Sequence, residues 1–228
     1  MSIIYNLKRS RKRRKTISLQ INNSSGVMVS APYFTPLTEI DNFIRSKTDW
    51  IKKAIARQQQ EKKEIGEKQY RGGEAFYYQG KKYPLEIIEV RDFQPCLVFS
   101  GRRFYLNSPG TKETGEKLFA FWYKARAKEY LTARVEHFSR IFGCPKTAVK
   151  ITSARNRWGS CGAENNISFS FRLMMAPPDV IDYVVIHELM HIQQKNHSTK
   201  FWTLVARSMP EYKIHRRWLK DNGHLLVF

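Results

Sequence analysis

Hydrophobic and polar positions alternate at the start of the chain and then change to a helical spacing. Five apolar side chains between residues 5 and 21 recur with period two, which is typical of half-buried β-strands. They are Tyr5, Leu7, Ile17, Leu19 and Ile21. From residue 38 to about residue 55 the apolar positions follow a helical spacing, and Gly72-Gly73 ends this region. The pattern therefore predicts a β-hairpin or a pair of strands, followed by a helix.

The middle of the chain combines short alternating runs with one long helical pattern. Four apolar runs between residues 74 and 107 predict short strands, joined by turns at Gln79-Gly80 and Ser100-Gly101. A helix is predicted at about 113–142, because large apolar side chains recur there at helical spacing. Gly143 follows the last of them and is expected to end the helix.

The last third of the chain predicts a small sheet and further helices. Strands are expected near 148–152 and 167–173, and a helix is expected to begin at Pro177-Pro178. Ser198 is placed to cap another helix at Thr199–Ser208.

A candidate domain boundary lies at Ser108-Pro109-Gly110. We therefore predict an α+β fold with two parts. Residues 1–110 form a β-rich accessory domain that contains a helix. Residues 111–228 form a catalytic domain with the long helix, a small sheet and the helix after Pro178.

That last helix contains His187-Glu188-Leu189-Met190-His191, which reads H-E-x-x-H. Positions four apart lie on one face of a helix, so His187 and His191 can present two imidazoles to one ion. Neutral imidazole suits Zn²⁺, and a catalytic zinc site needs three protein ligands and one open position. Zinc lowers the pKa of a water at that position, and Glu188 can take its proton as a general base. These residues predict a zinc hydrolase, most often a peptidase.

A solvated helix with scattered histidines is the alternative explanation of this motif. The flanking residues argue against it, because residues 180–186 are almost all apolar and indicate a helix buried on most sides. Buried imidazoles and a buried carboxylate need partners that offset their lost hydration, and a metal ion provides them.

The third ligand is predicted to be His197, six residues after the motif. The spacing requires the helix to end soon after His191 and the chain to turn back. Many zinc peptidases with a longer form of this motif have a left-handed glycine at that turn, but Gln194 stands there in this sequence. Asn196 tolerates the left-handed conformation and is the expected turn residue. His215 and Glu211 remain alternative ligands.

Several segments resemble the YgjP-like branch of the SprT-like zinc metallopeptidases. The resemblance covers nearly the whole chain and is densest from about residue 150 onward. It rests on Arg155-Asn156-Arg157-Trp158-Gly159-Ser160-Cys161, Ala176-Pro177-Pro178, Ile181-Asp182-Tyr183-Val184-Val185-Ile186-His187-Glu188-Leu189 and Asn196-His197-Ser198-Thr199-Lys200-Phe201-Trp202. It implies a zincin-like fold, the metal ligands His187, His191 and His197, and Glu188 as the base. It also implies an intracellular peptidase and leaves the substrate unidentified.

Composition favours a water-soluble protein of a reducing compartment. The three cysteines are an odd number without metal-ligand spacing, which argues against a disulfide framework and for the cytoplasm. No apolar run is long enough to span a bilayer, and no signal-peptide pattern is expected. Cys161 is interpreted as a free thiol near the site.

A net charge of +20 is the second strong feature of the sequence. Seven of the eight residues 8–15 are Lys or Arg, and further basic pairs are scattered along the chain. Such a charge favours nucleic acid or another polyanion as a partner through counterion release, although a solvated basic surface is the simpler explanation. No motif that reads DNA or RNA is present.

Other residues have weaker predicted roles. Asp182 could orient a ligand imidazole, or it could simply carry charge near the start of the helix. The oxyanion stabiliser is left open among Tyr183, Tyr212, His215 and Arg157. If the strand at 167–173 is the edge of its sheet, a peptide substrate could pair with it.

Three functional classes therefore stay open. A zinc-dependent peptidase that acts on protein or peptide is the leading prediction. A metal-dependent hydrolase of nucleotide phosphoanhydrides is compatible with the charge, but the sequence lacks a glycine-rich phosphate loop. A nucleic-acid-binding module with vestigial catalysis is the third, and the presence of Glu188 argues against it.

Overall fold

The computed structural model describes residues 3–22, 26–89, 94–107 and 111–228. It has a mixed α+β fold, as predicted, and it divides into two compact units, Met1–Gly66 and Glu67–Phe228. In the described part of the chain, no helix is both long and apolar enough to span a membrane.

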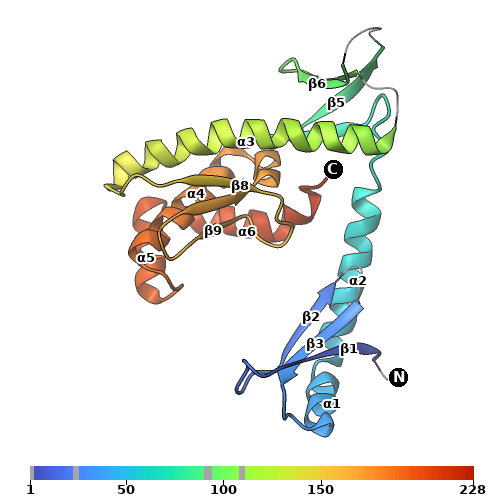
Figure 1. The fold of residues 1–228 in the computed structure, drawn as a ribbon, viewed down its shortest axis with the longest axis vertical. Coiled ribbons are helices and arrows are strands. Elements are labelled where there is room, and N and C mark those ends of the chain that lie inside the picture. The colour runs from blue at the N-terminus through green and yellow to red at the C-terminus, as the bar shows by residue number, and fades with distance from the viewer. Residues whose placement is uncertain (1–2, 23–25, 90–93, 108–110) are drawn as a thin grey trace. The chain divides into compact units, whose positions relative to one another are not determined.

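The first unit is a three-stranded sheet with two helices (Figure 1). Its strands are β1 (Tyr5–Ser10), β2 (Ser18–Asn22) and β3 (Gly26–Pro32), in the order β1-β3-β2. β1 runs parallel to β3 and β2 runs antiparallel to it. The predicted pairing of the first two strands with each other is therefore wrong, because β3 lies between them.

The helical region of this unit is interrupted once. It forms α1 (Leu37–Ser46) and α2 (Thr48–Ile65), with Lys47 between them. The core consists of alternate residues of β3 and three isoleucines of the helices. These residues are Val27, Val29, Ala31, Ile40, Ile44 and Ile51.

The second unit begins with a four-stranded sheet in the order β4-β5-β7-β6. The strands are β4 (Ala75–Tyr78), β5 (Lys81–Ile88), β6 (Cys96–Phe99) and β7 (Phe104–Asn107). The long predicted helix is α3 (Lys112–Phe142), which Thr111 caps through its hydroxyl and which ends at Gly143 in the left-handed conformation. Aromatic rings join the sheet to this helix, since Phe76 stacks on Phe119 with ring centroids 4.0 Å apart.

The structure divides the chain at Gly66, whereas the sequence predicted a division after residue 110. The strands at 75–107 belong with the second unit because Phe76, Leu85 and Phe104 are buried in the same core as α3. The turn after β4 also binds the second half directly, since the Gly80 amide donates to the Met175 carbonyl. The predicted boundary residues 108–110 lie outside the described residues.

A second, smaller sheet lies beside α3 (Figure 1). Its strands are β8 (Val149–Thr152), β9 (Gly159–Cys161) and β10 (Ile167–Ser170), in the order β8-β10-β9. The strand predicted at 167–173 therefore ends at Ser170, where a 3₁₀-helix, η1 (Phe171–Met175), begins. This strand is also central in the described sheet, so the condition under which a peptide could pair with it, an edge position, is not met.

Four helical segments complete the unit. They are α4 (Pro178–Gln193), α5 (Thr199–Ser208), α6 (Tyr212–Asn222) and the short 3₁₀-helix η2 (Gly223–Leu225). α4 contacts α3, α5, α6 and β9, so it is the central helix of this half. The sequence predicted α4 and α5 but not α6.

Candidate active site

Helix α4 brings three of the predicted site residues together. Pro178 lies at its start, where a missing amide hydrogen costs nothing, and the next two turns are packed with buried apolar side chains. Because the helix is central, Glu188 and His191 keep only 5% and 8% of their exposure. Packing of the apolar residues therefore determines the direction in which the motif side chains point.

The imidazoles of His187, His191 and His197 converge on one point. The Nε2 atom of His197 lies 3.0 Å from Nε2 of His187 and 3.1 Å from Nε2 of His191. In a tetrahedral zinc site with Zn–N bonds of about 2.0–2.1 Å, the ligand nitrogens are about 3.3 Å apart. Among the described residues these three form the group with metal-ligand geometry, and the alternatives His215 and Glu211 are not part of it.

The protonation of His187 and His191 fits a cation bound by their rings. The Nδ1 atom of His191 lies 3.0 Å from the Gln194 carbonyl oxygen. Since a carbonyl oxygen only accepts, Nδ1 carries the proton and Nε2 presents its lone pair to the cluster. Burial lowers the pKa of His187 to about 3 and also lowers that of His191, so both rings are neutral near pH 7, as metal ligands must be.

The joint between α4 and α5 places His197. Gln194 ends α4 in an extended conformation, and the predicted left-handed turn at Asn196 is not present. Asn196 acts through its side chain instead, because its Oδ1 accepts hydrogen bonds from the Gln194 side chain and the Ser198 amide at 2.8 and 3.3 Å. Ser198 lies at the N-cap of α5 without a side-chain capping bond. A local amide network thus replaces the glycine turn.

Aromatic rings hold the imidazoles from the side of α5. His191 stacks on Phe201 with centroids 4.4 Å apart, and His197 stacks on Trp202 at 5.6 Å. Trp202 in turn stacks on Tyr212 and carries the guanidinium of Arg216 over its ring at 4.6 Å. These contacts restrict the rotation of two ligand rings.

Glu188 follows His187 on α4, and its side chain lies in a tightly packed position. A Cβ atom on Gly159 of β9 would be only 2.7 Å from both Cγ and Oε1 of Glu188, so a larger residue at position 159 would displace the carboxylate. Burial raises the pKa of Glu188 to about 7, and the nearby Arg157 acts in the opposite direction. Its buried Oε2 has no hydrogen-bond partner among the described residues. Such a carboxyl group is suited to exchange a proton near neutral pH.

The family model for the YgjP-like metallopeptidase domain matches residues 15–222. The chain belongs to the YgjP-like metallopeptidase family. This confirms the resemblance inferred from the sequence. No curated protein matches the chain. The crystal structure of the metallopeptidase zymogen of Pyrococcus abyssi abylysin is similar over 40% of this chain and 93% of that one, with 22% identity and a TM-score of 0.37.

Two of the weaker predictions for this YgjP-like chain can be compared with the structure. Asp182 forms a two-pronged ion pair with Arg134 of α3, at 2.7 and 2.8 Å, so it joins two helices and does not orient an imidazole. Among the proposed oxyanion stabilisers, Tyr183 lies with its ring centroid 5.8 Å from that of His187. His215 stacks on the Tyr183 ring at 6.5 Å.

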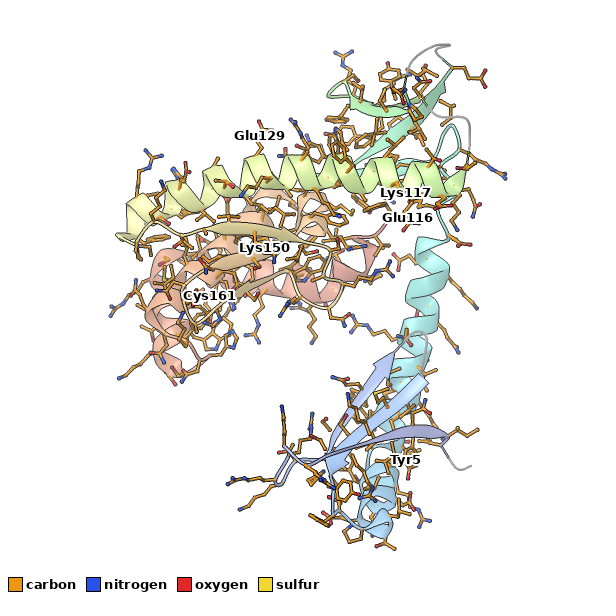
Figure 2. All side chains as sticks on the ribbon, viewed as in Figure 1. Tyr5, Glu116, Lys117, Glu129, Lys150 and Cys161 are labelled. Atoms are coloured by element: carbon orange, nitrogen blue, oxygen red, sulfur yellow. The ribbon has the colours of Figure 1, made fainter. Side chains whose placement is uncertain are left out.

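Cys161 has a polar neighbour that the sequence did not reveal. The Lys195 ammonium lies 3.5 Å from its sulfur and donates to the Gly162 carbonyl at 2.8 Å and to Asn165 Oδ1 at 2.6 Å. Lys195 comes from the joint that holds His197, and its three partners lie at the end of β9 and in the turn after it. The thiol is free, as predicted, and this lysine ties the joint to the sheet. Figure 2 labels Cys161 among the side chains of this half.

Gly159 and Lys195 are the positioning residues that sequence reasoning missed. Gly159 of β9 lies against the Glu188 side chain of α4, and Lys195 of the joint binds the end of β9 and the turn after it. Gly159 stood inside a segment that carried the family resemblance, but a glycine in a sequence does not reveal which side chain passes over it.

An open hollow of about 680 Å³ lies on α6. Four of its six lining residues are cationic: Lys213, Arg216, Arg217 and Lys220. Tyr212 lines it as well and connects it through the ring of Trp202 to His197. The candidate active site therefore has a basic surface two aromatic rings away.

Proposed function

We propose that this YgjP-like metallopeptidase is zinc-dependent, with His187, His191 and His197 as the metal ligands and Glu188 as the general base. One observation supports this most strongly: three Nε2 atoms converge, and the residue after His187 is a buried glutamate whose pKa burial raises to about 7. A structural zinc site would be closed by a fourth protein ligand. In the described residues the group contains three.

The chain's own residues divide the work of peptide hydrolysis. A metal ion held by His187, His191 and His197 would supply a Lewis acid, which would polarise a scissile carbonyl and make a water molecule more acidic. Glu188 accepts the proton of the attacking water at its carboxylate and then donates it to the leaving amine. Because the pKa of Glu188 is close to neutral, both transfers are accessible near pH 7. The stacked rings of Phe201 and Trp202 keep the ligand imidazoles in place.

The substrate is proposed to bind in an extended conformation along β9. This strand ends the described order β8-β10-β9, and its first residue touches Glu188. An added peptide strand would form main-chain hydrogen bonds with it and would run past the imidazole cluster. Because β10 is central, the strand with which a peptide is proposed to pair is β9 instead of β10.

A phosphoanhydride hydrolase is the second candidate, and one observation favours it. The basic hollow on α6 would attract a polyphosphate as readily as an acidic peptide. The family match favours the peptidase, and the hollow justifies a direct comparison of the two substrates.

The test measures bound metal and hydrolysis in the same preparations. Wild type, Glu188→Gln and His197→Ala are analysed for zinc and then assayed with an unfolded protein and with nucleoside triphosphates. Peptide cleavage that disappears in Glu188→Gln, while its zinc content stays near one equivalent, supports the proposal. Release of pyrophosphate with the same dependence supports the second candidate. A wild type that binds no metal contradicts both.

A further inference from the structure

The first unit carries an exposed basic and aromatic surface that the proposed metal site does not use. β1 and β3 are parallel, with Arg9 opposite Ala31 and Ser10 opposite Pro32, so the segments that follow the two strands emerge at the same end of the sheet. After β1 comes the basic loop, residues 11–15, in which every residue is Lys or Arg. After β3 comes the aromatic turn, residues 32–35, which contains Tyr33 and Phe34.

Direct contacts hold the loop and the turn together. The Arg9 guanidinium donates to the carbonyl oxygens of Tyr33 and Thr35 at 2.5 and 2.7 Å. The Arg11 guanidinium lies over the Tyr33 ring, 5.0 Å from its centroid. The turn is closed by a hydrogen bond from the Thr35 amide to the Pro32 carbonyl, and Pro36 follows it. The two segments therefore form one ordered surface.

The aromatic side chains of this surface are unusually exposed. Phe34 is 90% exposed and Tyr33 is 44% exposed, and their rings meet edge to face at 5.2 Å. An exposed phenylalanine loses hydration free energy that a core position would recover, so a ring in this position is suited to a binding partner. At this exposure the Phe34 ring is accessible to another planar ring.

The charges beside these rings identify the kind of partner. Four of the five side chains of the basic loop are exposed, and in the described residues no carboxylate forms an ion pair with any of the five. Nitrogen-tipped side chains project from the connection between β1 and β2 (Figure 2). Closely spaced cations next to a stacking ring match a chain of phosphates with unpaired bases.

We propose that this surface binds single-stranded nucleic acid. The basic loop contacts the phosphates, and Phe34, supported by Tyr33, stacks on a base. A duplex hides the faces of its bases and would use only the charges. An anionic membrane is a poorer match, because insertion of the Tyr33 ring would take the Arg11 guanidinium with it into an apolar layer. The proposal is independent of metal-dependent hydrolysis.

The test measures binding of the full chain to a fluorescent 20-nucleotide oligo(dT), to a 20-base-pair duplex and to vesicles of phosphatidylcholine and phosphatidylserine. Two variants change the surface: Phe34→Ala, and Lys12→Glu combined with Arg14→Glu. Their matched controls are Phe121→Ala, which removes a 75% exposed ring from α3, and Lys52→Glu with Lys53→Glu, which reverses two exposed charges on α2.

We expect oligo(dT) to bind more tightly than the duplex and to weaken steeply as salt increases. Phe34→Ala should weaken binding of oligo(dT) roughly tenfold, and the double charge reversal should weaken it by more than about tenfold. Each control should change it less than about threefold, because neither control alters a residue of the basic loop or of the aromatic turn. Equal or tighter duplex binding, an unchanged Phe34→Ala variant, binding only to vesicles, or no binding at all would each overturn the proposal.

Discussion

The imidazole cluster on α4 and the basic surface of the first unit both collect nitrogen-bearing side chains, but they treat charge in opposite ways. In the cluster, burial lowers the pKa of His187 and His191 so that neutral rings face one another. In the basic loop, four of five side chains are exposed and keep their charge in water. Burial therefore favours neutral groups that can donate a lone pair to a metal, whereas exposure to water favours cations that can bind an anion.

We expect the largest effect from the loss of one of the three imidazoles. His197→Ala removes the nitrogen that lies within 3.1 Å of both other ligand atoms, so zinc should fall from about one equivalent to near zero and peptide hydrolysis should be lost. His215→Ala is the matched control, because His215 stacks on Tyr183 without joining the cluster. Elemental analysis measures the zinc content of both variants, and a peptide assay measures hydrolysis. If His215→Ala loses the metal and His197→Ala retains it, the ligand assignment is wrong.

A substitution at Gly159 should impair the general base and leave the metal ligands intact. In Gly159→Ala the new methyl group would lie 2.7 Å from the Glu188 side chain and would push the carboxylate away. A shift of about 1 Å in a catalytic group can cost about a hundredfold in rate, so we expect at least that loss in kcat with the zinc content unchanged.

Gly162→Ala is the control for this substitution. Its Cβ would meet the Asn166 carbonyl oxygen at 3.5 Å, which is an ordinary contact, and Gly162 is not among the glycines with positive φ. Hydrolysis by Gly162→Ala should therefore stay near the wild-type rate. Equal losses in the two variants would show that the strand as a whole, and not the position of Glu188, is sensitive to substitution.

These two tests also show what the sequence could and could not predict. The spacing of His187, Glu188 and His191 is a local property of one helix, so the sequence was sufficient to group them. The strand order β8-β10-β9 depends on contacts between distant segments, and alternation within one strand does not indicate which strand is at the edge. Gly159 was missed for the same reason, since its role exists only where β9 meets α4.

The core of each unit explains why the chain divides after Gly66 and not after residue 110. The break at Ser108-Pro109-Gly110 was a strong turn signal, but Phe76 and Phe104 pack on Phe119 beyond it. A turn signal reports a change of chain direction, and only burial shows on which side of a domain boundary the next element lies. α6 was not predicted, because its apolar residues do not form one buried face: Tyr212 is buried, whereas Ile214 is 67% exposed.

The pH dependence of stability tests whether burial raises the pKa of Glu188. In metal-free protein, burial raises the pKa of Glu188 from 4.5 to about 7, so the folded state holds this proton more tightly than the unfolded chain. The contribution of Glu188 to the free energy of unfolding therefore falls as pH rises from about 4.5 to about 7 and is constant above that. Glu188→Gln lacks this loss. Its stability relative to wild type should increase across the same window by up to about 3 kcal/mol.

Urea unfolding of chelator-treated protein at a series of pH values measures this difference. His187 and His191 have lowered pKa values, so they make both proteins more stable as pH rises, and their contribution largely cancels when the variant is compared with wild type. A difference that stays constant from pH 4.5 to 7 would mean that the Glu188 carboxyl group is not desolvated in the folded protein.

Charge reversal in the basic loop should have the smallest effect on stability and on hydrolysis. Lys12→Glu with Arg14→Glu changes two exposed side chains. The free energy of unfolding should therefore change by less than about 0.5 kcal/mol, and zinc content and hydrolysis of a short uncharged peptide should stay at wild-type values. Calorimetry and the peptide assay measure these quantities. If hydrolysis of that peptide falls together with oligonucleotide binding, the basic loop and the imidazole cluster are coupled. If only oligonucleotide binding falls, the two regions act independently. The exposed cations of the basic loop then contribute to binding a partner, whereas the buried groups of α4 contribute to hydrolysis.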